Sequence, residues 1–308
     1  MADIVVIGSL NADLVVRSPR FPNPGETISG EDLQIIPGGK GANQAVAAAR
    51  QGVKVTMIGR VGSDSFGPFL VDNLKSNQVD TAHVLADESA TGTAIIVVDS
   101  NGQNSIVLSP GANGKVTPAD VDSASFLNPS TGSGRRSSLL LLQLEIPTPT
   151  VLHAAQKARA HGLTVILNPA PARPLPAELL ASVDILIPNE SELSLLTGMS
   201  VDDTVSAERA AKEILKQGVK TVIVTLGSKG ALLVSGTQVI HVNTYPVNVV
   251  DTTAAGDAFI GGFASALLNN KTLEDSVRYG CACGALATTK FGAQPSLPTK
   301  EEVERFIA

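Results

Sequence analysis

The chain has 308 residues, 43% of them hydrophobic and 17% charged, and 23 Lys and Arg against 29 Asp and Glu give a net charge of 23 − 29 = −6. These values predict a globular protein with a large core and argue against a disordered chain or a coiled coil. The negative charge argues against nucleic acid or an anionic membrane as a partner. With no Trp, 2 Tyr and 8 Phe, the chain has little material for stacking on bases or polysaccharides, so we expect small molecules or proteins as partners.

The amino-terminal residues MADIVVIGSL carry neither the basic segment nor the long apolar segment and cleavage site of a signal peptide. We therefore interpret their short apolar run as the first strand. No apolar run approaches the ~18 residues of a membrane-spanning helix. We therefore expect a cytoplasmic protein. Cys281 and Cys283 stand two positions apart in a predicted helix, where side chains do not face each other, so we expect buried, reduced thiols.

Short apolar segments bounded by Gly, Pro or Asn recur along the chain and alternate with segments of helical spacing. The predicted strands are 4–8, 53–59, 139–144, 164–168, 184–188 and 221–226, and the predicted helices are 42–51, 65–77, 149–161, 207–217, 255–268 and 273–289. Strands that alternate with helices imply right-handed crossovers and a mostly parallel sheet with helices on both faces. We expect a doubly wound α/β fold, with residues 1–308 forming a single domain.

Two regions depart from this alternation. Residues 11–36 and 92–108 have the period-two pattern of exposed strands, and Asn101-Gly102 is a hairpin turn signal. They predict a small antiparallel accessory sheet. The low-complexity segment 128–138, NPSTGSGRRSS, predicts a surface loop.

The segment 251–262, DTTAAGDAFIGG, places a glycine loop at the start of a predicted helix. The free N–H groups and positive dipole of a helix start form an anion site, and Gly256 allows a phosphate to come close. Asp257 lies in the first turn and could be a simple cap. A cap does not account for the second carboxylate, Asp251, or for the hydroxyl of Thr253 in the same loop.

The segment 37–45, PGGKGANQA, resembles a phosphate loop but fits neither common form. Lys40 is followed by Gly41 instead of Ser or Thr, and Gln44 stands where a dinucleotide fingerprint needs its third glycine. A Walker ATPase and a dinucleotide-dependent oxidoreductase therefore lose support. The segment is either a glycine-rich turn before a helix or a close approach to a small polar ligand, with Asn43 offering its amide.

The segment 8–13, GSLNAD, ends the first predicted strand with Asn11 and Asp13 two residues apart, so both point the same way. A carboxylate that accepts from vicinal hydroxyls, beside an amide that donates and accepts, can hold a small sugar without an aromatic platform. Asn and Asp are also ordinary turn formers, and that interpretation remains open.

Taken together, these segments resemble the PfkB carbohydrate kinase family over essentially the whole chain. The matching segments are GSLNAD at 8–13, PGGKGANQAVAAAR at 37–50, TLGSKG at 225–230, DTTAAGDAFIGG at 251–262 and AQPS at 293–296. The resemblance, nearest to the family members that phosphorylate ribose, implies a doubly wound α/β domain. It also implies a β-sheet lid, formed here by parts of 11–36 and 92–108, that often makes a dimer contact. The implied reaction transfers the γ-phosphoryl group of ATP to a sugar hydroxymethyl group.

The resemblance also implies roles for individual residues. Asp257 is the expected catalytic base, beside an anion hole at Ala255 and Gly256. The positions that match sugar-binding residues are Asn11, Asp13, Gly39, Lys40, Asn43 and Glu145. Those that match ATP-binding residues are Asn189, Thr225, Gly227, Gly230 and Gly256. Those that match an activating monovalent cation site, usually potassium, are Asp251, Thr253, Ala287, Lys290, Gly292 and Ser296, several through carbonyls only. Glu192 belongs to an N-x-x-E motif that helps to place Mg²⁺ and phosphate.

The expected reaction is ATP-dependent phosphorylation of D-ribose at its primary 5-hydroxyl, by an enzyme that is a homodimer through the lid. Deoxyribose, fructose or a nucleoside such as adenosine are alternative substrates for the same machinery. A nucleoside would need an apolar or aromatic wall, so a small pentose is favoured by the polar residues at the sugar-binding positions, Asn11, Asp13, Lys40, Asn43 and Glu145. A sugar-binding regulator without catalysis is the alternative from another class, and the intact Gly256-Asp257 pair argues against it.

Overall fold

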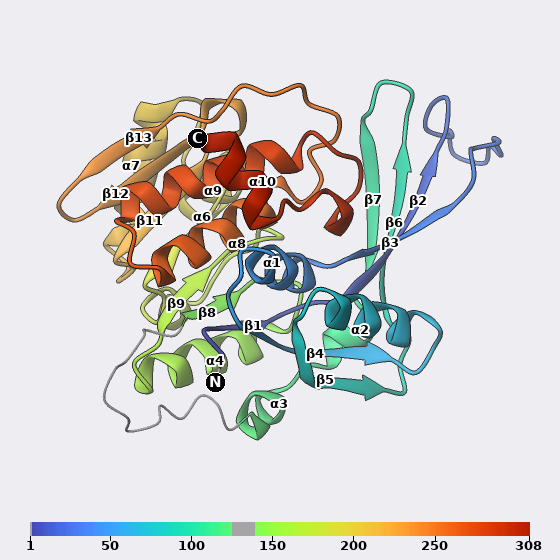
Figure 1. The fold of residues 1–308 in the computed structure, drawn as a ribbon, viewed down its shortest axis with the longest axis horizontal. Coiled ribbons are helices and arrows are strands. Elements are labelled where there is room, and N and C mark those ends of the chain that lie inside the picture. Colours follow the sequence, from blue (N-terminus) through green and yellow to red (C-terminus); the bar gives the residue numbers. More distant parts are fainter. Residues whose placement is uncertain (1, 125–138) are drawn as a thin grey trace.

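The computed structural model describes residues 2–124 and 139–308, and within them a nine-stranded sheet runs through the centre of the molecule (Figure 1). The predicted loop at 128–138 lies outside the described residues. From one edge to the other the strands are β13 (Val239–Val242), β12 (Ala231–Ser235), β11 (Thr221–Thr225), β10 (Ile185–Leu186), β9 (Thr164–Leu167), β8 (Leu139–Leu142), β1 (Ile4–Ile7), β4 (Val55–Gly62) and β5 (Asp80–Asp87). Strands β11 to β5 pair in parallel, and β12 and β13 add an antiparallel edge.

Helices cover both faces of this sheet, which confirms the predicted doubly wound α/β class. Side chains alternate along β1, so Ile4 and Val6 join one apolar core while Val5 and Ile7 join the other. The first core is covered by α1 (Lys40–Ala49), α2 (Phe66–Ser76), α8 (Ala255–Leu268), α9 (Leu273–Ala287) and α10 (Lys300–Ile307). The second is covered by α3 (Pro118–Ser123), α4 (Thr148–Ala160), α5 (Ala177–Leu180), α6 (Glu190–Thr197) and α7 (Thr204–Leu215). Among the described helices, none combines the length and the hydropathy that crossing a membrane requires.

Two glycines inside α8 allow three helices to pack closely. A Cβ at Gly261 would lie 2.4 Å from the Cβ of Ala47 on α1, and one at Gly262 would lie 2.4 Å from the sulfur of Cys283 on α9. Cys281 and Cys283 are both buried and free, as predicted. The contact between α1 and α8 matters for the site, because each of these helices begins at one of the glycine-rich segments.

A second sheet projects from the body, on the right of Figure 1, in the order β3-β2-β6-β7. Its strands are β3 (Gln34–Gly38), β2 (Asn11–Arg17), β6 (Gly92–Val98) and β7 (Asn104–Ser109). The β3–β2 and β6–β7 pairs are antiparallel, as predicted, whereas β2 and β6 pair in parallel. The parallel pair arises because β2 follows β1 and β6 follows β5, so both leave the parallel sheet in the same direction.

Candidate active site

The predicted site residues converge at the carboxyl edge of the central sheet. Residues that follow parallel strands meet at that edge, where open α/β sheets bind their ligands. Asn11 begins β2 just after β1, and Glu145 follows β8, the neighbour of β1. Lys40 is the first residue of α1, and Asp257 lies in the first turn of α8.

Asp257 is 6% exposed and is held by two amides of α1. Its Oδ2 accepts a hydrogen bond from Nδ2 of Asn43 at 2.9 Å, and its Oδ1 accepts one from Nε2 of Gln44 at 3.0 Å. Burial raises the pKa of Asp257, while Lys40, Asn43 and Gln44 hold the rise back. A buried carboxylate of raised pKa, fixed by two donors, is suited to accept a proton.

The start of α8 is open and uncapped. Ala254, just before the helix, adopts a left-handed backbone (φ 59°), and no side chain in the described part of the chain caps the first N–H groups. A Cβ placed at Gly256 would have nothing within 4 Å. Asp257 bonds to α1 and not to the N–H groups of its own helix, so the simple cap is excluded. The backbone N of Ala255 donates to the carbonyl of Thr252 at 3.3 Å, and among the described residues the N–H groups of Gly256 and Asp257 have no partner and are left for an anion.

Lys40 lies among four carboxylates. Burial alone would lower the pKa of Lys40, but Asp257, Glu145, Glu192 and Asp13 raise it above its ordinary value. The ammonium group therefore stays charged and offsets much of the repulsion among the carboxylates.

Asp13 is 7% exposed on β2. Burial, together with the charges of Glu145 and Asp257, raises its pKa to about 7, and Lys40 opposes the rise. The carboxylate occupies the space of a missing side chain, since a Cβ at Gly38 would lie 2.1–2.6 Å from its atoms. Gly38 therefore allows the Asp13 carboxylate to lie against β3.

Asn11 is oriented by Asn113, a residue that the sequence did not point to. Asn113 lies in the short helix η1 (Gly111–Lys115) and is 1% exposed. Its Nδ2 donates to Oδ1 of Asn11 at 2.7 Å and to the carbonyl of Leu10 at 3.0 Å, and its Oδ1 accepts from the backbone N of Leu10 at 2.9 Å. Because Oδ1 of Asn11 is engaged, this pairing sets which side of the Asn11 amide is left to donate.

Glu145 connects the segment 8–13 to the glycine-rich segment 37–45. Its Oε2 accepts from Oγ of Ser9 at 2.5 Å and from the backbone N of Lys40 at 3.0 Å. Gly39, with φ 89°, makes the turn that aims that N–H, and a Cβ there would lie 2.7 Å from the backbone N of Asn11. Ser9 is a second site residue that the sequence did not indicate.

Four of the five residues predicted to bind ATP lie where β10 and β11 end, and the fifth, Gly256, lies at the start of α8. Asn189 and Thr225 form a bridge between the two chain segments. Asn189 and Glu192 also form a reciprocal capping box at the start of α6, with hydrogen bonds of 2.8 and 2.9 Å. Gly227 begins the single turn η3 (Gly227–Lys229) and Gly230 follows it, with positive φ angles of 55° and 91°. The N-x-x-E motif thus has a structural role in α6 as well as its predicted role toward phosphate.

The residues predicted to hold a monovalent cation come from two connected loops. Oδ1 of Asp251 accepts from the backbone N and Oγ1 of Thr253 at 2.9 and 2.7 Å, and its Oδ2 accepts from the backbone N of Gly292 at 2.9 Å. The backbone N of Asp251 donates to the carbonyl of Thr288 at 3.1 Å, one residue beyond Ala287. The side chain of Lys290 pairs with Glu302 at 2.7 Å, which leaves Lys290 only its carbonyl for a cation.

The donor set fits a hard cation. It combines the carboxylate of Asp251, the hydroxyl of Ser296 and the backbone carbonyls of residues such as Thr253, which are the oxygen ligands that hard cations prefer. Ser296 is fully buried in η4 (Gln294–Ser296), where its Oγ donates to the carbonyl of Ala293 at 2.7 Å.

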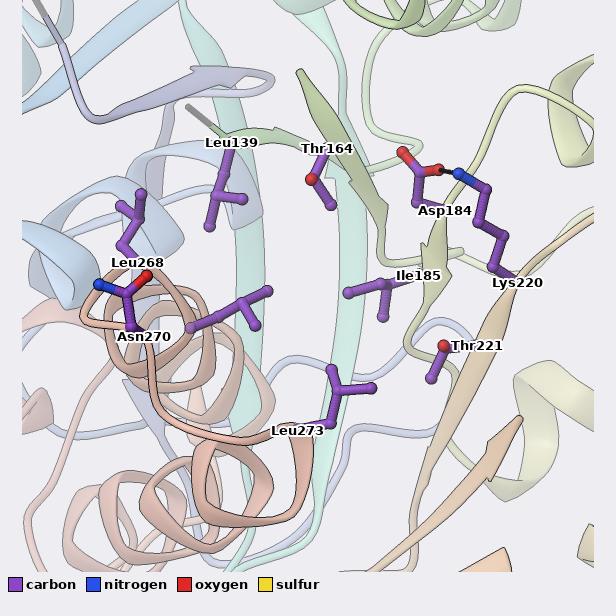
Figure 2. Close-up of a pocket in the computed structure, with 10 residues that line it drawn as sticks. Leu139, Thr164, Asp184, Ile185, Lys220, Thr221, Leu268, Asn270 and Leu273 are labelled. Carbon is purple, nitrogen blue, oxygen red and sulfur yellow. Dashed lines mark ion pairs between the residues drawn. The ribbon is translucent and has the colours of Figure 1, made fainter. Parts of the chain in front are cut away.

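A cavity of about 250 Å³ separates the second sheet from the cation loops. It is lined by Asp13 of β2, by the inward side chains of β2, β3 and β6, and by residues 249–253 and 291–293. Another cavity, of about 310 Å³, lies at the amino ends of the strands of the central sheet, opposite the carboxyl edge (Figure 2). Leu139, Thr164 and Thr221, the first residues of β8, β9 and β11, line it beside the Asp184–Lys220 ion pair of 2.7 Å. It contains none of the predicted site residues.

The fold is a doubly wound α/β fold, and its second sheet faces a buried carboxylate at an open helix start. These features are those of a carbohydrate kinase. The chain belongs to the pfkB family of carbohydrate kinases, whose model matches residues 1–300. The chain is 44% identical over 305 residues to a ribokinase of Haemophilus influenzae, covering 99% of this chain and 98% of that protein. It is 39% identical over 308 residues to a deoxyribokinase of Salmonella typhi, covering 99% of each. The structure of an Arabidopsis thaliana ribokinase complexed with ribose and ATP matches with a TM-score of 0.89 and 36% identity, covering 99% of this chain and 98% of that one.

Proposed function

We propose that this chain transfers the γ-phosphoryl group of ATP to the primary 5-hydroxyl of D-ribose. The observation that carries the proposal is the polar cluster around Asp257, in which Asn11, Asp13 and Asn43 are buried and Lys40 and Glu145 are partly buried. These groups can pair with several hydroxyls of a small sugar without an aromatic wall. The 44% identity to a ribokinase and the Arabidopsis structure with ribose and ATP support the same substrates.

Asp257 takes the proton of the sugar hydroxyl as the oxygen attacks the γ-phosphorus of ATP. The N–H groups of Gly256 and Asp257, with the α8 dipole, stabilise the negative charge on the transferring group, while the N–H of Ala255, also predicted for this role, is engaged by the carbonyl of Thr252. Asn11, Asp13, Asn43 and Glu145 position the sugar, while Asn189, Thr225, Gly227 and Gly230 position the nucleotide. Positioning and charge neutralisation do most of the work in phosphoryl transfer, so this arrangement is sufficient without a covalent intermediate.

Two cations complete the proposed site. Mg²⁺, bound with ATP, supplies charge neutralisation at the phosphates, and Glu192 is the carboxylate that would help to place it. A monovalent cation, K⁺ in our proposal, would be held by Asp251, the carbonyls of Thr253, Ala287, Lys290 and Gly292, and Ser296. Because Asp251 already bonds Thr253 and Gly292, a cation there would stiffen the loop that leads into α8.

We expect K⁺ to activate the enzyme. Replacing K⁺ by tetramethylammonium at constant ionic strength should lower kcat by about tenfold, the equivalent of ~1.4 kcal/mol of lost positioning. Initial rates of ADP release in the two salts measure the effect. The Asp251→Ala variant should be slow in both salts, and equal wild-type rates in the two salts would contradict the proposed cation site.

The raised pKa of Asp13, about 7, predicts how sugar binding depends on pH. Ionised Asp13 accepts from sugar hydroxyls through two charged oxygens, whereas the protonated form is a weaker, neutral acceptor. Its ionised fraction falls from about nine tenths at pH 8 to about one tenth at pH 6. The KM for the sugar should therefore rise by about tenfold as the pH falls over that range. The Asp13→Asn variant should have a high KM that no longer changes with pH, and a flat wild-type KM would contradict this role.

Substrate choice is tested by a panel of ribose, deoxyribose, fructose and adenosine with ATP and Mg²⁺, with ADP release as the readout. We expect the highest kcat/KM with ribose. Deoxyribose is the second candidate, because a relative named deoxyribokinase is 39% identical over nearly the full chain. Turnover of deoxyribose above that of ribose would replace the proposed substrate and leave the catalytic residues as proposed.

We also propose that the chain forms one catalytic domain and that its second sheet is the lid.

The outer face of that sheet, in our proposal, pairs two copies of the chain. An apolar row crosses all four strands of the sheet in register, with Ile35, Leu14, Ile95 and Val107 as neighbours. Ile35, Ile95 and Val107 are 47%, 49% and 64% exposed, and contiguous exposed apolar patches mark interaction sites. Light scattering should give a dimer for the wild type and a monomer for Ile95→Asp, and a monomeric wild type would contradict the pairing.

A further inference from the structure

Two fully buried glutamines stand behind the Asp257 carboxylate. Gln44 is on α1 and Gln143 follows β8, and both side chains are 0% exposed. Nε2 of Gln143 donates to Oε1 of Gln44 at 2.6 Å, and Nε2 of Gln44 donates to Oδ1 of Asp257 at 3.0 Å. The three side chains form one hydrogen-bonded series that runs from the core to the carboxylate.

This series fixes the orientation of the Gln44 amide. Since Oε1 of Gln44 is engaged by Gln143, its NH₂ group must face Asp257, and the same nitrogen lies 3.3 Å from Oδ1 of Asn168. The reversed amide would set an oxygen against the carboxylate and an NH₂ group against the NH₂ group of Gln143.

Burying these two amide side chains lowers the stability of the fold. Oε1 of Gln143 is buried without a hydrogen-bond partner among the described residues, and an unsatisfied buried acceptor destabilises a protein. The side chain also requires a glycine beside it, because a Cβ at Gly8 would lie 2.1 Å from Oε1 of Gln143. Apolar side chains of the same size would fill this space without that cost, so the polar pair points to a role outside stability.

We propose that Gln44, oriented by Gln143, is a positioning residue that holds the carboxylate of Asp257 in the plane from which it accepts the sugar proton. Gln44 fixes Oδ1, and Asn43, the residue before it on α1, fixes Oδ2. The carboxylate therefore cannot rotate, and its remaining lone pairs keep a constant direction. This inference rests on the proposed role of Asp257 as the base.

The charged groups that face Asp257 come from four other segments. Lys40 is at the start of α1, Glu145 follows β8, Asp13 is on β2 and Glu192 is on α6. Gln44 lowers the pKa of Asp257 against the effect of burial by donating to the ionised form. Removing that donor leaves the other charges in place and should raise the pKa, so activity should be lost at a higher pH as the solution is acidified.

The test compares three Gln→Met variants with the wild type. Gln44→Met removes the donor to Asp257, and Gln143→Met keeps that donor but frees its orientation. Gln51→Met is the matched control, because Gln51 is also buried, follows the end of α1, and bonds Tyr279 and the carbonyl of Pro298 away from the site. The readouts are kcat against pH for ribose and ATP, and a ¹³C NMR titration of the Asp257 carboxyl, assigned with Asp257→Asn.

For Gln44→Met we expect the acid limb of kcat and the titration of Asp257 to move up by about one pH unit, the size of one lost hydrogen bond to a charged group. We expect the plateau kcat to fall by about tenfold, with the KM for ribose within about threefold of wild type. Gln143→Met should move both readouts the same way by less, and Gln51→Met should move neither. Unchanged titration of Asp257 in Gln44→Met, or in Gln143→Met if the first variant does not fold, would overturn the inference. A wild type that phosphorylates no sugar would instead remove the proposed function, while the NMR titration would still decide the role of Gln44.

Discussion

Replacing Asp257 by Asn should lower kcat by about 10²–10⁴-fold, the usual contribution of a general base. Asn keeps the shape and can still pair with Asn43 and Gln44 in part, but it cannot take the proton of the sugar hydroxyl. The carboxylate is buried and held from two sides, so its position is fixed for accepting this proton. The coupled release of ADP at saturating sugar and ATP measures the change.

The matched control for this variant is Asp275→Asn. Asp275 also lies in the first turn of a helix, α9, where it bonds the capping residue Thr272 and faces solvent. Its replacement should affect the stability of α9 slightly and leave kcat unchanged. A kcat of Asp257→Asn close to wild type would show that another group accepts the proton, and the assignment would fail.

Replacing Lys40 by Met should lower kcat/KM by about 10²-fold, with the greatest loss at acid pH. The size corresponds to one lost charge-assisted contact of up to ~3 kcal/mol, converted at 1.4 kcal/mol for each factor of ten. Without the ammonium group, Asp13 and Asp257 lose the nearby positive charge that lowers their pKa values. Both pKa values should rise, so both carboxylates become protonated, and lose their function, at a higher pH than in the wild type.

The pH profile of kcat/KM between pH 6 and pH 9 is the measurement for Lys40→Met. Lys212→Met is the control, because Lys212 is an exposed residue of α7 that pairs with Glu208 on the far side of the sheet from α1. A parallel fall in kcat/KM at every pH, without displacement of the acid limb, would mean that Lys40 binds ligand without setting the charge state of the carboxylates.

The central elements of the fold could be predicted from the sequence because their apolar pattern is strong. The helix predicted at 255–268 has those bounds in the structure, and each predicted strand overlaps a strand of the central sheet. Strands β5, β12 and β13 were not predicted. Strands β5 and β13 lie at the sheet edges, where side chains such as Asp80 and Val239 face solvent and the core imposes no pattern, whereas β12 is a short buried strand that follows β11 directly. The parallel β2–β6 pair could not be predicted either, since it depends on how two distant segments leave the first sheet.

The site was predictable where it follows short motifs and not where it depends on packing across the chain. Asp257 and Asn43 stand in recognisable segments, and the structure brings them to 2.9 Å. Gln143 and Asn113 act on residues 99 and 102 positions away, and no local pattern marks them. Gln44 was visible only as a residue that breaks a dinucleotide motif, although it contacts the carboxylate at the centre of the site.

The most direct test of the proposed reaction is ³¹P NMR of the products formed from ATP, Mg²⁺, K⁺ and ribose. The wild type should convert ATP to ADP and ribose 5-phosphate in equal amounts, with the new phosphorus coupled to the protons of C5, and Asp257→Asn should form neither at a comparable rate. Phosphate on another carbon, inorganic phosphate in place of a sugar phosphate, or equal product from Asp257→Asn would contradict transfer to the 5-hydroxyl by Asp257.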